Sequence, residues 1–187
     1  MGRRSEPRLV RWTKRLESAT ALDTVIGGVS GLTKALTANR RVSAMVRGVW
    51  AGHALHPVLT DLPLGAWSSA TVLDLVGGRT ARPAAQRLLG LGIVAAVPTI
   101  VTGWAEWAEA DRPAQRVGVV HAAANSAALG LYSVSWLTRR RGNHSRGVLF
   151  ALAAGSAVGL GGYLGGHLTE VRKVSSYHPA FDEGRPA

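Results

Sequence analysis

The stretch GVLFALAAGSAVGLGGYLGGHLT, residues 147–169, decides the fold class of this chain. It contains no Lys, Arg, Asp or Glu, and Gly155, Gly159, Gly162 and Gly166 recur every three or four residues. A helix of this length is about long enough to cross a hydrocarbon core of ~30 Å. Small residues at this spacing let helices approach closely in lipid, whereas each glycine would cost a soluble helix about 1 kcal/mol. The stretch therefore predicts a membrane-spanning helix.

Three other stretches resemble it in composition. Residues 88–105 carry no charged side chain, and residues 117–138 carry none apart from the titratable His121. Residues 57–78 form a weaker candidate, because Asp61 and Asp74 lie within them. The polar connections are short, so neighbouring spans should be antiparallel. We expect an all-α integral membrane protein, an up-down four-helix bundle over residues 51–170 with spans at about 57–78, 88–105, 117–138 and 147–168.

A basic leader of residues 1–50 precedes these spans, and a polar tail, 171–187, follows them. Residues 1–56 hold ten Lys or Arg and three Asp or Glu, so they supply +7 of the formal net charge of +11. No apolar core of a cleavable signal peptide follows the first basic residues. Apolar side chains instead recur at helical spacing, at Leu16, Ala19, Leu22, Val25, Ile26, Val29, Leu32 and Leu36. This pattern predicts an amphipathic helix, which lies on an anionic membrane face or packs on the bundle; we favour the membrane face.

The composition also excludes several classes of function. The chain has no Cys, which excludes disulfides, thiolate metal ligands and a cysteine nucleophile. The basic residues are concentrated in the leader and in loops, without a recognisable nucleic-acid reading motif, so we expect no nucleic-acid partner. No hydrolase triad or phosphate-binding loop is present, and the sequence does not identify an enzyme.

Polar side chains converge on one side of the expected bundle. The beginning of spans 1 and 3 and the end of spans 2 and 4 must share that side. The potential ligands there are His53, His56, Asp61, Glu106, His121, Asn125 and His167. Ionisable groups near a bilayer are costly, so function is the default hypothesis, although each residue taken singly is more often structural.

Three kinds of ligand fit this layer. Two His from different spans could hold haem b, for which we expect His53, His56, His121 and His167, with Asn125, to be the cofactor-binding candidates. The same four His with Glu106 and Asp61 could hold a transition-metal ion. A quinone or proton-relay pocket is a third possibility. The alternative class is a non-catalytic membrane accessory or scaffold subunit.

Four motifs resemble the family of bacterial four-span membrane proteins catalogued as domain of unknown function 2231. The first is GHALHP (52–57) followed by DLPLGAW (61–67). Three further motifs match the actinobacterial branch of the family, and they are TGWAEW (102–107), RVGVVH (116–121, with Asn125) and GGYLGGHL (161–168). The resemblance covers roughly residues 10–183. It implies the four-span fold but no established activity. Members of this branch are often fused to a Rieske iron–sulfur domain, which needs cysteines that this sequence lacks.

The departures from the family pattern mostly keep polar chemistry. Many relatives have His where Asp61 stands and Asp where Glu106 stands, and the segment after His167 differs. The fusion implies an electron-transfer partner, of Rieske type or another kind, in addition to the lipid bilayer. Seven Arg or Lys flank the spans on each side, so charge does not orient the protein. Because a long basic leader is hard to translocate, we expect a multi-pass plasma-membrane protein with a cytoplasmic N-terminus, and homo-oligomerisation stays open.

Overall fold

The protein is all-α. The computed structural model describes residues 6–174 and 178, and no strand occurs among them. Two short 3-10 turns, Thr20–Leu22 and Val49–Ala51, and a terminal π-helical turn, His167–Val171, complete the regular structure. The α-helices are α1 (Arg8–Glu17), α2 (Asp23–Thr37), α3 (Arg40–Arg47), α4 (Leu55–Val76), α5 (Arg82–Ala108), α6 (Arg112–Arg140) and α7 (His144–Gly166).

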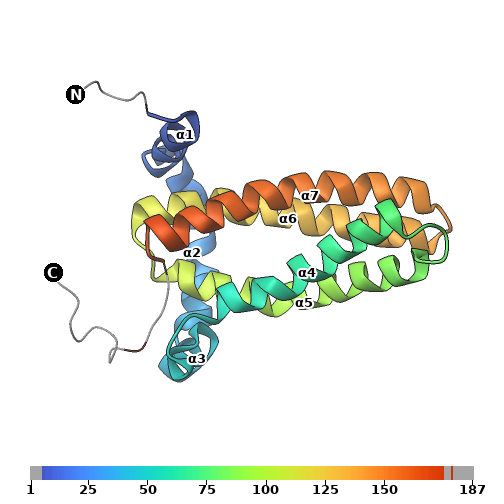
Figure 1. Ribbon diagram of the computed structural model, residues 1–187. Coiled ribbons are helices and arrows are strands. Elements are labelled where there is room, and N and C mark those ends of the chain that lie inside the picture. The colour runs from blue at the N-terminus through green and yellow to red at the C-terminus, as the bar shows by residue number, and fades with distance from the viewer. Residues whose placement is uncertain (1–5, 175–177, 179–187) are drawn as a thin grey trace.

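The four long helices α4 to α7 run side by side in alternating directions and form what we call the long-helix body (Figure 1). Helix α4 packs most extensively on α5, and α6 on α7. The body is therefore a pair of helical hairpins, and the interface between the hairpins is less extensive. This division matters because the candidate site lies between them.

Charged residues mark the ends of these helices. Helices α5 and α6 begin at Arg82 and Arg112, each followed at once by a proline. Proline suits the first turn, where its missing N–H has no intrahelical partner. Helix α6 ends with Arg139 and Arg140, which complement the negative end of the helix dipole. The helices therefore extend beyond the uncharged stretches that predicted them.

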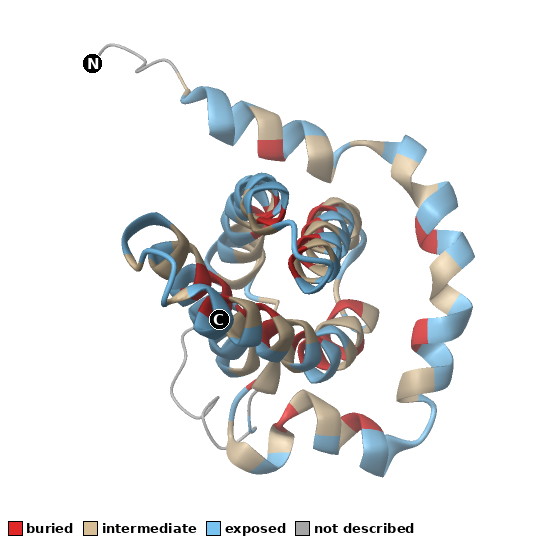
Figure 2. Cartoon of the chain, turned by 90° about the vertical axis from the view of Figure 1, so that its right-hand side faces the viewer, coloured by how far each residue is buried: buried red, intermediate tan, exposed pale blue. Residues whose placement is uncertain are grey.

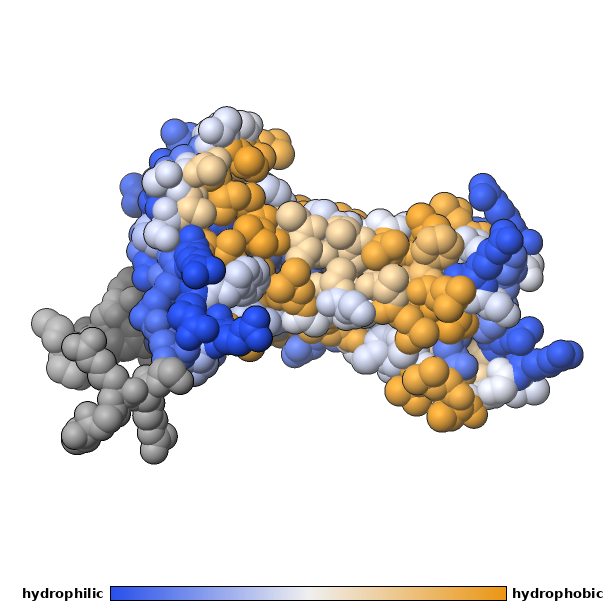
Figure 3. All heavy atoms as spheres, turned by 90° about the horizontal axis from the view of Figure 1, so that it is seen from above, coloured by the Kyte–Doolittle hydropathy of each residue, from blue (hydrophilic) through white to orange (hydrophobic). Residues whose placement is uncertain are grey.

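The long-helix body has the composition of a membrane protein. In the described part of the chain, α5, α6 and His144–Val171 are long and apolar enough to cross a membrane, and α4 is not among them. Its buried residues are mostly small, with nine alanines from Ala66 to Ala154 under 7% exposed. Large apolar residues such as Leu91, Val94 and Leu149 face outward instead. In Figure 3 hydrophilic side chains gather at both ends and apolar ones lie between them, as expected for a surface solvated by lipid.

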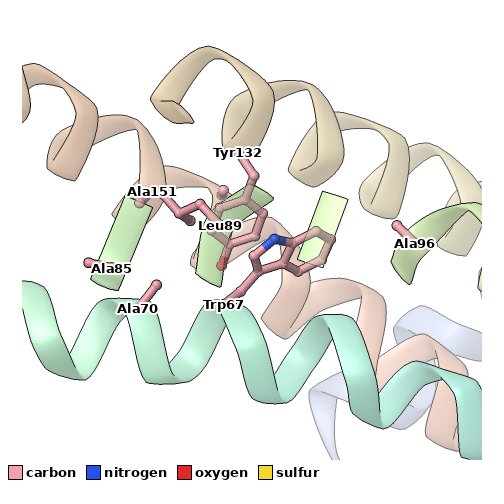
Figure 4. Close-up of a cluster of buried hydrophobic side chains, with 8 residues drawn as sticks. Trp67, Ala70, Ala85, Leu89, Ala96, Tyr132 and Ala151 are labelled. Carbon is pink, nitrogen blue, oxygen red and sulfur yellow. The ribbon is translucent and has the colours of Figure 1, made fainter. Parts of the chain in front are cut away.

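An aromatic pair connects the two hairpins inside the body. The rings of Trp67 on α4 and Tyr132 on α6 stack with centroids 4.2 Å apart and planes at 19° (Figure 4). A Cβ added at Gly92 on α5 would lie 2.3 Å from the indole Nε1 of Trp67. Only glycine therefore lets α5 approach this ring so closely. The pair and the alanines around it pack the interior of the body.

A proline inside α4 is compensated by a neighbouring helix. Pro63 has no N–H to donate to the carbonyl of Leu59, four residues earlier. The hydroxyl of Thr99 on α5 donates to that carbonyl over 3.1 Å, and also to its own helix at Ala95. In a lipid environment an unsatisfied backbone group is costly, so this bond lets α4 continue through the proline.

The leader forms three short helices instead of the single amphipathic helix expected from residues 16–36. Helix α1 ends at Glu17, and the 3-10 turn at Thr20–Leu22 separates it from α2. The Asn39 side chain accepts from the N–H groups of Arg41 and Val42 and so starts α3 as a new helix. Gly48, with φ of +76°, ends it. Asn39 and Gly48 are residue types typical of helix ends, and both lie beyond the apolar pattern of residues 16–36.

Helices α1, α2 and α3 follow one another around one end of the body like three sides of a frame (Figure 2). We call them the collar. Thr13, Ile26, Thr33 and Ser43 are its buried residues and mark the side that packs inward. Arg116 on α6 holds α2 through two bonds to Asp23, Nε to Oδ1 at 2.9 Å and Nη2 to Oδ2 at 2.7 Å. This guanidinium lowers the pKa of Asp23.

Large apolar side chains of the collar nevertheless remain exposed, and they include Leu9, Val10, Val25, Leu32, Val42 and Met45. In the part visible in Figure 3, apolar side chains of the collar lie toward the long helices and hydrophilic ones on the far side. The collar therefore packs on the body with one edge, and it also presents an unburied apolar face of the kind that lies on a membrane surface.

Candidate functional site

Two histidines face each other between the hairpins. His56 lies in the first turn of α4, and His121 in the first half of α6. Their ring centroids are 6.4 Å apart, and the ring planes meet at 79°. Each Nδ1 lies 2.9 Å from a backbone carbonyl on the other helix of its own hairpin, Thr99 on α5 and Gly161 on α7.

These bonds define the chemistry of each ring. A carbonyl oxygen only accepts, so each Nδ1 must carry the proton and donate it. In the neutral imidazole this leaves the lone pair on Nε2. The same second-shell arrangement, an N–H bonded to a backbone carbonyl, orients histidines that ligate metals. Both rings are therefore held in one tautomer with Nε2 available.

Glycines make room for the rings. A Cβ at Gly103 on α5 would lie 2.7 Å from Cε1 of His56. On α7, a Cβ at Gly161 would lie 2.5 Å from Oδ1 of Asn125, and one at Gly165 would lie 3.1 Å from Cε1 of His121. The glycine pattern that predicted close helix packing thus serves a specific purpose here, which is to bring helix backbones against the polar cluster.

Asn125 lies one turn after His121 on α6. Its Nδ2 donates to the His121 carbonyl over 3.0 Å, and it lies 3.1 Å from Nε2 and 3.4 Å from Nδ1 of the ring. An amide nitrogen that donated to the Nε2 lone pair would lie about 5 Å from Nδ1, because that lone pair points away from the ring. The Asn125 amide therefore packs against the ring and does not occupy its lone pair.

A cavity of about 380 Å³ adjoins this cluster. His56, His121 and Asn125 line it, together with residues of all four long helices. The aromatic and aliphatic part of its wall includes Leu64, Trp67, Ile100, Trp104, Leu129 and Val158. Its volume lies within the range of small-molecule and cofactor sites, and the mixture of an apolar wall with few polar groups is typical of them.

The structure separates the other expected ligands. His53 and Asp61 are exposed and do not line the cavity. His167 also lies outside the lining, where its Nε2 is 2.8 Å from Oε1 of Glu17 on α1. Glu106 does line the cavity, is only 6% exposed, and has Oε1 3.9 Å from Nε of Arg47 on α3.

The expected six-residue metal set is therefore not brought together. Over residues 6–174 and 178, no three His, Asp or Glu side chains lie close enough to hold one metal ion. The topology did place these residues at one end of the body. The rotation of each helix about its own axis then determines which side chains point inward. Those that line the cavity are His56, His121, Asn125 and Glu106.

The opposite end of the body holds a polar cluster that sequence reasoning missed. Arg139 on α6 donates from Nη1 and Nη2 to the two carboxylate oxygens of Asp74 on α4, each over 2.6 Å. Both side chains are almost completely buried, at 1% and 2% exposure. Ser135 donates to the carbonyl of Gly147 over 2.6 Å, and His144 lies 3.5 Å from Asp74. The signal in the sequence was an acid inside an otherwise apolar segment, facing a run of arginines.

Comparison with known proteins now identifies the family. The family model of predicted membrane proteins named DUF2231 matches residues 52–177. The chain belongs to this family. Neither the comparison with curated proteins nor that with solved structures found a match.

The match to DUF2231 begins just before α4 and covers the whole long-helix body. Both histidines of the cavity and the Asp74–Arg139 pair lie within it. The collar, residues 8–47, lies outside the matched range. The family assignment thus supports the membrane character of the body and carries no named ligand or reaction.

Proposed function

We propose that this protein is a redox-associated membrane subunit that crosses the bilayer with four helices and holds haem b between His56 and His121. The observation that carries this proposal is the pair of carbonyl-anchored imidazoles, 6.4 Å apart, on the wall of a large cavity. An electron-transfer partner, such as a Rieske protein, would then receive or supply the electron.

Helix α4 is the fourth span in this proposal. Its 22 residues are about as long as a hydrocarbon core is thick, and it runs alongside the other three long helices. Asp74 puts a charge into α4 that disfavours a membrane span, but the charge of Arg139 neutralises it. Asp61 is exposed and lies within two turns of the start of α4, close to the collar. At the membrane interface a carboxylate there can stay in contact with water.

The two imidazole rings lie 6.4 Å apart on different hairpins, and each Nδ1 donates to a backbone carbonyl. The two Nε2 atoms are therefore the groups that would hold the haem iron. Bis-His haem needs only two protein ligands. The absence of a third nearby ligand in the described residues therefore disfavours a non-haem ion more than haem.

The surroundings of the two rings also suit a macrocycle. The cavity wall is largely apolar, and Gly103 and Gly165 let the two imidazoles lie against helix backbones. Haem bound here would supply one-electron chemistry, while the protein's own residues would fix the ligand rings and exclude water. Glu106 lines the same cavity.

A second candidate is a quinone or proton-relay site. It is favoured by the size of the cavity and by the Nε2 atom of His56, for which the described residues provide no hydrogen-bond partner. A quinol hydroxyl could donate to this lone pair. The two candidates use the same residues but differ in their spectra.

The absorbance spectrum and elemental analysis of detergent-purified protein test the proposal. We expect a Soret band and about one iron per chain, both lost in His56→Ala and in His121→Ala. His53→Ala and His167→Ala are matched controls that should keep the band, because neither side chain lines the cavity. A folded protein without a Soret band would overturn the haem proposal. Saturable quinone binding that depends on His56 would then favour the second candidate, and unaltered binding would favour a scaffold.

We also propose that the collar lies in the cytoplasmic interface of the plasma membrane. Since the chain has no Cys, single cysteines can be introduced at exposed positions at either end, Ser18 on the collar side and Thr80 on the other. A membrane-impermeant maleimide added to intact cells should label the Thr80→Cys protein and spare the Ser18→Cys protein. The reverse pattern would overturn this orientation.

A further inference from the structure

A second hollow lies at the end of the body far from the collar. Its volume is about 430 Å³, and its wall includes Arg82, Gln86 and Arg87 from α5, Arg139 from α6 and His144 from α7. It is separate from the histidine cavity, with which it shares no lining residue. The proposed redox function makes no use of it.

The charge around this hollow is strongly unbalanced. Seven arginines lie at this end, Arg79, Arg82, Arg87, Arg139, Arg140, Arg141 and Arg146. Asp74 is the only Asp or Glu among residues 62–105 and 112–169, and Arg139 already occupies both of its carboxylate oxygens. Among the described residues, Arg82 and Arg87 have no ion-pair partner. The hollow therefore presents two uncompensated guanidinium groups beside His144 and the amide of Gln86.

The surface beside the hollow is apolar. Leu75, Val76, Leu91, Leu137, Leu149 and Phe150 are exposed large residues near this end of α4 to α7. The guanidinium of Arg140 lies over the ring of Trp136, 4.9 Å from its centroid, as at a membrane–water interface. A basic hollow at headgroup level with an apolar flank has the chemistry of an anionic-lipid site.

We propose that this hollow binds a phosphate group, carried by an anionic phospholipid or free in solution. The planar, always-charged guanidinium groups of Arg82 and Arg87 match the geometry of phosphate oxygens. The side chain of Gln86 adds a neutral hydrogen-bond donor. Arg139 contributes to the wall, but its charge is balanced by Asp74, so the specificity rests on the α5 residues.

Native mass spectrometry of the full-length protein in detergent tests the lipid source, with phosphatidylglycerol and zwitterionic phosphatidylcholine as probes. A thermal-shift titration with inorganic phosphate tests the free source. The variant is R82Q/R87Q, and the matched control is R141Q/R146Q, which removes the same charge from the same end outside the hollow. We expect the wild type to prefer phosphatidylglycerol by about tenfold or more, and R82Q/R87Q to lose most of that preference.

Retention of the preference in the control and its loss in R82Q/R87Q would support a lipid site. A phosphate shift with the same variant pattern, without preference between lipids, would support a site for free phosphate. Equal loss in both double variants would reduce the effect to general surface charge and overturn the proposal. The absence of any phosphate shift or lipid preference in the wild type would overturn it as well.

Discussion

Arg139 and Asp74 meet through two parallel hydrogen bonds of 2.6 Å in the interior of the body, on helices α6 and α4. Each is nearly inaccessible to solvent. This bidentate pair joins the two hairpins at the end opposite the histidines. A buried charge near a bilayer is costly unless an opposite charge compensates it, so each of these two side chains is stable there only because the other is present.

Removing one partner should therefore be far worse than removing both. We expect Asp74→Ala to lower the free energy of unfolding by about 3–5 kcal/mol, because it leaves Arg139 buried and uncompensated. The double variant Asp74→Leu/Arg139→Met should recover most of that loss. Denaturation in mixed micelles measures both, with the exposed Asp61→Asn as a control. Additive losses would contradict the coupling.

The bond across Pro63 makes a second prediction. Thr99→Val keeps the shape of the side chain but removes its donor, so the Leu59 carbonyl loses its partner, at a cost of about 1–3 kcal/mol. Pro63→Ala restores a backbone N–H that can donate to the same carbonyl. In the Pro63→Ala background, Thr99→Val should therefore cost less. An equal cost in both backgrounds would show that the hydroxyl does not compensate for the proline.

Glycines on α7 provide a matched pair for testing close packing. Gly161→Ala places a methyl group 2.5 Å from Oδ1 of Asn125 and should destabilise the protein by about 1–3 kcal/mol. Gly159→Ala meets no atom within 4 Å and should be neutral or stabilising. Thermal unfolding in detergent measures the difference. Similar effects of the two substitutions would contradict the proposed tight approach of α7 to the Asn125 amide.

The attachment of the collar should depend on pH. Because Arg116 lowers the pKa of Asp23 below its usual 3.8, the pair contributes stability above that pKa. The contribution is lost as the pH falls through the lower, folded pKa. Spin labels at Thr24 on α2 and Glu109 beyond α5 should therefore move apart only in strongly acidic solution. Asp23→Asn should show the longer distance at neutral pH too; an unchanged distance would contradict this attachment.

The apolar face of the collar should enter the membrane interface. Leu32 is 72% exposed on α2, and Lys34, two residues later, lies on nearly the opposite face of the helix. A nitroxide at position 32 in a lipid bilayer should be relaxed mainly by oxygen, and one at position 34 mainly by a water-soluble nickel chelate. Equal access of the nickel chelate to both positions would place the collar in water.

The sequence predicted the long helices well because charge-free length is a direct physical requirement of a span. The expected segments 88–105, 117–138 and 147–168 all lie within observed helices, apart from the last two residues, which belong to the π-helical turn. It was less informative about the leader, where the apolar pattern of residues 16–36 continues across the break at Ser18. The single helix expected there is instead the end of α1, a 3-10 turn and α2, and α3 begins beyond it at the Asn39 cap.

For the candidate site, the sequence predicted that seven polar residues lie at one end of the bundle, and the order of the helices does place them at one end of the body. It could not distinguish those residues, because the direction of a side chain depends on helix rotation and on its neighbours. Packing brought His56, His121 and Asn125 to one cavity and left His53 and Asp61 exposed. It turned His167 toward Glu17 instead. His144 closely follows the run Arg139–Arg141 in the sequence and begins α7 beside Asp74.

Composition and spacing by themselves determined that this is an all-α membrane protein with a basic leader, because hydrophobic length and the distribution of charge act along the chain. Tertiary structure alone decided how the carbonyl groups of Thr99 and Gly161 orient two distant imidazoles. It alone decided that Arg139 neutralises Asp74, 65 residues away. Both relationships depend on which helix faces lie together, a property of packed helices that no single segment encodes.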